Sequence, residues 1–83
     1  MKKKFSIELS SDLDFEGMVV DISYDMQPIA SLNYEKGIEK IEIEMQPNAR
    51  KLAFPIEEFF HILHKAKELA VKCAKEDEDR KNS

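Results

Sequence analysis

The sequence has few of the residues that build metal, redox or phosphate sites. Its 83 residues include one cysteine, Cys73, two histidines, two glycines and no tryptophan. A lone cysteine excludes an intramolecular disulfide, and this cysteine and the two histidines form no zinc set with known ligand spacing. Two isolated glycines, Gly17 and Gly37, form no glycine-rich phosphate loop. We therefore expect no cofactor and no metal, and we expect that the protein is not an enzyme.

Long hydrophobic runs are also missing. No apolar stretch approaches transmembrane length, and the basic residues 2–4 are not followed by the apolar segment of a signal peptide. A cytoplasmic protein is expected, and the lone cysteine agrees with that location. The length predicts a single domain over residues 1–78, followed by a frayed charged tail at 79–83. A chain of this size has a thin core, so oligomerisation is an available further source of stability.

Apolar and polar residues alternate in four short segments, which is typical of strands with one buried face. The segments are 4–10, 18–25, 29–35 and 41–45. Their short connections favour an antiparallel meander, because parallel pairing needs long crossovers.

Proline and glycine mark the expected breaks between these segments. Pro28 is expected to stop the second segment, because proline removes a ladder donor. An acidic residue followed by Met-Gln-Pro occurs twice, at 25–28 and 44–47. We expect that both strands stop in the same way, and a decayed hairpin duplication is the alternative. Residues 51–54 are either a short fifth strand or an extended linker before Pro55.

A long C-terminal helix is predicted from Pro55 to residue 78, with Glu57 and Glu58 placed where the helix dipole favours acids. Its apolar arc covers about half of the circumference, which is wider than one sheet contact requires. The expected fold is therefore α+β, with two layers: a four-stranded antiparallel meander covered by this helix. The excess apolar surface predicts a homodimer. The helix face assigned to the core and the dimer contact consists of Phe59, Phe60, Leu63, Ala66, Leu69, Ala70 and Cys73.

The opposite helix face carries two histidines and two acids at Glu57, His61, His64 and Glu68. Such a set can indicate a metal or acid–base site. Lysines lie beside it and nothing in the sequence encloses it, so we interpret it as a solvated face with pairs four residues apart.

Acidic residues are concentrated in the half of the chain that holds the strands. Residues 1–46 contain five lysines against ten acids, whereas residues 47–83 contain eight basic residues against seven acids. A solvated face of a one-sided sheet is one interpretation, and a docking face for a basic partner is the other. The second interpretation predicts a small non-catalytic protein-binding role, as an inhibitor, immunity-type or adaptor protein. The candidate partner-binding residues are Asp21, Asp25, Glu35, Glu42 and Glu44.

Two stretches carry a local resemblance to a known family. Residues 14–22, DFEGMVVDI, and a second region running from 45–47 through 50–51 to 55–59 resemble the single-stranded-DNA-binding family of positive cofactor four. That family has the same plan of four antiparallel strands and one helix, doubled across the helices. The resemblance implies single-stranded nucleic-acid binding as the alternative function. The cationic contacts available for it are Lys2, Lys3, Lys4, Arg50 and Lys51, but the acidic face has no aromatic residue for base stacking.

Overall fold

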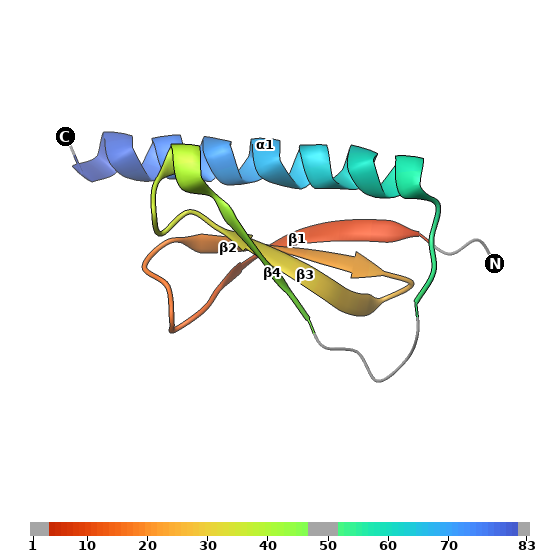
Figure 1. Ribbon diagram of the computed structural model, residues 1–83. Helices are drawn as coiled ribbons and strands as arrows, with labels where there is room; N and C mark the ends of the chain where they lie inside the picture. Colours follow the sequence, from red (N-terminus) through yellow and green to blue (C-terminus); the bar gives the residue numbers. More distant parts are fainter. Residues whose placement is uncertain (1–3, 47–51, 82–83) are drawn as a thin grey trace.

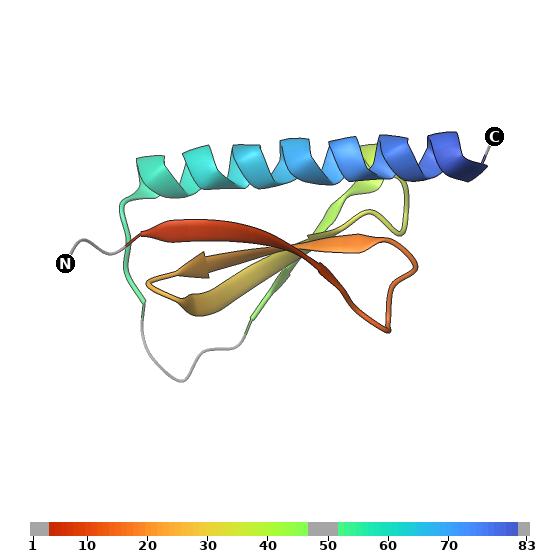
Figure 2. The same cartoon turned by 180° about the vertical axis from the view of Figure 1, so that it is seen from behind.

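The protein folds into one antiparallel sheet with a long helix lying across one face, in a computed structural model that describes residues 4–46 and 52–81 (Figures 1 and 2). The strands neighbour one another in chain order. They are β1 (Phe5–Ser11), β2 (Met18–Tyr24), β3 (Gln27–Asn33) and β4 (Glu42–Met45), with a 3₁₀ turn, η1 (Ile38–Lys40), before β4 and helix α1 at Ile56–Lys81. The predicted two-layer α+β meander is confirmed.

The long helix α1 begins directly after Pro55, as expected for a residue that suits a first turn. It continues to Lys81, beyond the predicted end at residue 78. The suggested fifth strand is absent from its described part, because Leu52–Phe54 has no strand structure. Residue 51 lies outside the described residues. Leu52 and Phe54 instead pack against the core.

The core lies between α1 and the face of the sheet that the alternation marked as apolar. Val20 and Ile22 are fully buried there. The helix contributes short side chains at its middle and towards its C-terminal end, which allow the helix and the sheet to approach closely. These buried helix residues are Ala66, Ala70, Cys73 and Ala74. Near the start of the helix the core consists instead of a cluster of aromatic side chains, with ring centroids 4.7–6.1 Å apart. Its members are Phe5, Tyr24, Phe54 and Phe59.

The β2–β3 connection corrects the expectation that Pro28 stops a strand. Asp25 and Met26 both have positive φ, at 51° and 67°, and form a two-residue hairpin turn between Tyr24 and Gln27. Pro28 lies inside β3, opposite Ser23. The register shifts at this point, and such an irregularity is where a sheet tolerates a missing amide donor.

Helix α1 covers the sheet unevenly. It packs over β1, β2 and β3, whereas among the described residues no Cα of α1 lies within 8 Å of a Cα of β4. Strand β4 is therefore an edge strand that the helix leaves uncovered, and Figure 1 shows it crossing in front of the sheet. The other edge, β1, faces the viewer in Figure 2.

Candidate functional site

Three acids lie in one row across the face of the sheet that points away from α1. Glu8 on β1 is opposite Asp21 on β2, and Asp21 is opposite Ser31 on β3. Ser31 is in turn opposite Glu44 on β4. Alternation places all four side chains on the same face, because directly paired residues of neighbouring strands share a side. Glu42 follows on the same face of β4, opposite Asn33.

Exposure differs between the edges and the centre of this outward face. Glu8, Glu42 and Glu44, on the edge strands, are exposed. Asp21 is half-buried and accepts a hydrogen bond of 2.7 Å from the Ser10 hydroxyl. Ser31 and Asn33 share the outward face but are buried in the central strand β3. The acidic surface is therefore strongest along the two sheet edges.

One cation partly compensates this surface. The ammonium of Lys36 lies 3.0 Å from a carboxylate oxygen of Glu42, and both side chains are more than half exposed. A pair this exposed contributes about 0–1 kcal/mol. Within residues 4–46 and 52–81, we find no lysine or arginine paired with Glu8, Asp21 or Glu44.

Two of the candidate acids lie away from this face, at opposite ends of β3. Asp25 is in the β2–β3 turn, where its amide donates to the carbonyl of Lys4 over 2.9 Å. Glu35 follows β3 at the other end and accepts a 2.5 Å hydrogen bond from the amide of Glu16. The structure thus brings Asp21 together with Glu42 and Glu44, and it separates Asp25 and Glu35 from them.

The predicted helix face divides into a buried centre and an open flank. Ala66, Ala70 and Cys73 are buried, whereas Phe60 is 53% exposed. Phe59, Leu63 and Leu69 are half-buried. Burial raises the pKa of the Cys73 thiol, and the nearby charges of Glu76 and Asp77 add to this effect. Cys73 is therefore a small buried side chain, in agreement with its place in the apolar arc.

An apolar groove of about 800 Å³ separates the open flank of α1 from β4 and the segment before it. Charged residues, among them Glu42 and Lys67, also line it. The apolar residues that line it are Leu32, Ile38, Ile41, Ile43, Phe60, Leu63 and Val71. The groove exists because α1 does not reach β4.

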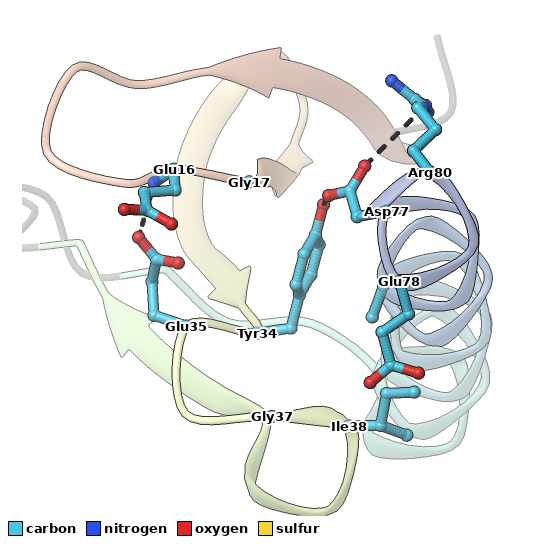
Figure 3. Close-up of a pocket in the computed structure, with 10 residues that line it drawn as sticks. Glu16, Gly17, Tyr34, Glu35, Gly37, Ile38, Asp77, Glu78 and Arg80 are labelled. Atoms are coloured by element: carbon cyan, nitrogen blue, oxygen red, sulfur yellow. Dashed lines mark hydrogen bonds and ion pairs between the residues drawn. The ribbon is translucent and has the colours of Figure 1, made fainter. Parts of the chain in front are cut away.

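A second pocket, of about 510 Å³, lies near the C-terminal end of α1 and surrounds Tyr34 (Figure 3). The Tyr34 hydroxyl donates to the Asp77 carboxylate over 2.5 Å and accepts from the Met18 amide over 2.9 Å. Arg80 lies 3.7 Å from the other oxygen of Asp77. Burial and the hydrogen bond to Asp77 raise the pKa of Tyr34 to about 12. The phenol therefore stays protonated near neutral pH and links the sheet to the helix.

The Tyr34–Asp77 link was missed in the sequence, although one signal for it exists. Asp77 follows Cys73 by four residues, so it continues the buried helix stripe with an acid. A carboxylate in a buried stripe needs a hydrogen-bond partner. The sequence gives no means of choosing Tyr34 as that partner.

The polar helix face is open to solvent. All four of its candidate ligands are exposed, and His64 pairs with Glu68 over 2.7 Å. The described part of the chain contains no group of three or more acids, histidines or cysteines placed to hold a metal ion. Within the same ranges, we find no helical segment with the length and apolarity needed to span a bilayer.

Comparison of the chain with models of protein families, with curated proteins and with solved structures gave no match. The strand-and-helix plan of the positive cofactor four family is present, but its stacking surface is not. Phe5 and Tyr24 are the aromatic residues of the four strands, and both pack on the helix side of the sheet. Among the described strands, the outward face therefore has no aromatic platform for bases.

Alkaline pH is expected to destabilise the protein through Tyr34. The folded chain holds the phenol proton more tightly than the ordinary pKa of 10.0 implies. The stabilisation of the folded state by the protonated Tyr34 phenol is therefore complete below pH 10 and is lost as the pH rises towards about 12. The urea midpoint should fall more steeply between about pH 9 and about pH 11.5 in the wild type than in Tyr34→Phe.

Tyr24→Phe is the matched control for this titration, because Tyr24 is equally buried in the same sheet face. It leaves the Tyr34–Asp77 hydrogen bond in place, so it should keep the steep alkaline loss of the wild type. Equal slopes for the wild type and Tyr34→Phe would contradict the raised pKa.

Proposed function

We propose that the protein is a small non-catalytic binding protein that docks a basic partner against the outward face of its sheet. An inhibitor, an immunity-type protein or an adaptor acts in this way, and the proposal includes a cytoplasmic location. The observation that carries it is the row formed by Glu8, Asp21 and Glu44 across the sheet. No cation of the described ranges pairs with these three acids.

Backbone pairing supports this role, because it holds the acids at fixed spacing on one surface. A partner with matching cations meets charges that are already in place, so little side-chain ordering is needed on this side. The acids of the edge strands are exposed, and exposed charge accelerates encounter with an oppositely charged partner. Binding of this kind weakens as salt screens the charges.

Charge reversal on β4 tests the docking face. Glu42→Lys/Glu44→Lys should reduce the recovery of a basic partner from a lysate of the source cells by at least about tenfold, since like charges now meet. The matched control is Glu76→Lys/Asp79→Lys, which makes the same charge change at exposed positions near the end of α1. This control should recover the partner as well as the wild type does.

Two results would reject the docking face: equal recovery by all three proteins, or equal loss in both charge variants. A fluorescent single-stranded oligonucleotide is also expected to show no binding at any salt concentration. Binding at low salt that fades steeply as salt rises would favour the nucleic-acid alternative instead.

Homodimerisation stays a prediction. The wide apolar arc that suggested it is divided between the core and the flank beside the groove. A second copy is therefore not required to explain the arc. Sedimentation at several concentrations tests the dimer, which a constant monomer mass would rule out.

A further inference from the structure

Among the described residues, no strand pairs with the outer edge of β4, so its outward-pointing backbone groups are open beside the apolar groove. The Gln46 amide donates to the Ile29 carbonyl over 2.9 Å, so this amide points towards β3. Amide directions alternate along a strand. The amides of Ile43 and Met45 therefore point away from β3, towards the open edge. A free edge of this kind accepts an added strand from another chain.

The side chains of β4 fix the chemistry of a strand that could be added there. Ile43 is 44% exposed and lines the groove, and Met45 shares its side of the strand and is 60% exposed. Glu42 and Glu44 occupy the opposite side. A complementary strand therefore has apolar residues on the groove side and basic residues on the acidic side, alternating along its length.

The same alternation disfavours β4 of a second copy as the occupant. Antiparallel pairing of two β4 strands over more than one residue keeps both apolar sides together only in registers that place Glu42 or Glu44 opposite another glutamate. Directly opposed like charges destabilise a sheet. A register shifted by one residue would instead place the outward-pointing amides opposite residues whose backbone groups point to β3, so no ladder could form. The edge is therefore suited to a basic chain rather than to itself.

We propose that the edge of β4 and the adjoining groove bind an extended segment of a partner in which apolar and basic residues alternate, added as a fifth strand of the sheet. This inference rests on the proposed function, and it specifies how the basic partner is held. The added strand pairs with the free backbone groups of Ile43 and Met45. Its apolar side chains enter the groove against Phe60, and its basic side chains lie beside Glu44.

The probe for this site is a labelled synthetic peptide of alternating valine and lysine. Its control is an isomer of the same composition with the valines and the lysines in separate blocks. Fluorescence anisotropy with the full chain should show binding of the alternating peptide and at least about tenfold weaker binding of the isomer. Addition of the alternating peptide should also slow hydrogen exchange at the Ile43 and Met45 amides.

Phe60→Ala should weaken binding of the alternating peptide by roughly tenfold, as loss of an aromatic anchor does. Ile56→Ala is the matched control, because Ile56 is a similarly exposed apolar residue of α1 that does not line the groove. It should bind the peptide like the wild type.

Three results would overturn the inference and leave the acidic docking face standing. These are equal binding of the two peptides, unchanged exchange at Ile43 and Met45 in the bound state, or no binding by either peptide. Self-association that Phe60→Ala abolishes would also overturn it, because a second copy would then occupy the groove. The two proposals can fail separately. The peptide experiments test the added strand, whereas the charge-reversal experiment tests the docking face with the natural partner.

Discussion

Replacing Gly17 by alanine is expected to destabilise the protein by about 2–4 kcal/mol, a large effect for a single added methyl group. A Cβ at this position would lie 2.5 Å from the Cε2 atom of Tyr34 and 2.7 Å from its hydroxyl oxygen. The ring cannot move away freely, because its hydroxyl is bonded to Asp77 and to the Met18 amide. Alanine at residue 17 must therefore displace Tyr34 and break the link between the sheet and the end of α1.

Chemical denaturation of four proteins measures this coupling: the wild type, Gly17→Ala, Tyr34→Leu and the double variant. Removal of the ring leaves space for the new methyl group, so the cost of Gly17→Ala should fall below about 1 kcal/mol in the Tyr34→Leu background. An unchanged cost would mean that the close approach of Gly17 to Tyr34 is not the cause.

Gly37→Ala is the control for this cycle, because it destabilises through a different mechanism. Gly37 has φ of 109°, a conformation that favours glycine, and no atom of the described residues beyond its two chain neighbours lies within 4 Å of its would-be Cβ. Its cost of about 1–3 kcal/mol comes from backbone strain. That cost should be the same with and without the Tyr34 ring.

Ile22→Ala is expected to lower the free energy of unfolding by about 2–5 kcal/mol. Ile22 is fully buried at the centre of β2, between the flanking strands and under the short side chains of α1. Loss of its outer atoms leaves a cavity that the sheet cannot close. A domain of this length has roughly 4–12 kcal/mol of total stability, so the loss is a large share of it.

Ile43→Ala is the matched control on β4, in the same face of the sheet. Because Ile43 is 44% exposed beside the open groove, its truncation should cost less than about 1 kcal/mol. Urea unfolding of both variants gives the comparison. Similar losses for the two isoleucines would show that the inner face of β4 is covered, which contradicts the open groove.

The alternation of apolar residues was sufficient to predict the sheet and the face that the helix covers, whereas the strand order was favoured only by the short connections. The alternation was sufficient because most of the apolar residues of the strands share one face, and a shift of one residue would move that whole set to the other face. The ends of the strands were less predictable. The sequence Asp25-Met26 forms a turn with positive φ, whereas Glu44-Met45, from the same tetrapeptide pattern, lies in a strand paired with β3. Whether such a segment forms a turn or a strand is therefore decided by the strand that it pairs with, rather than by its local sequence.

The candidate acids show the same limit. Phase along the strands correctly placed Asp21, Glu42 and Glu44 on one outward face. It gave no means of seeing that Asp25 and Glu35 lie beyond the strand ends. The open groove was also invisible, because the position of α1 across the sheet depends on the aromatic cluster at one end and on Tyr34 at the other.

The chain-order meander also determines how the molecule can assemble during synthesis. Each strand pairs with the one made just before it, so the sheet can form from hairpins that are local in sequence. The covering helix follows the strands in the chain, and the core face of the sheet, including Val20 and Ile22, is open to solvent until α1 arrives. A nascent chain released before residue 56 would present this surface to other proteins, which makes truncated products candidates for aggregation and for chaperone binding.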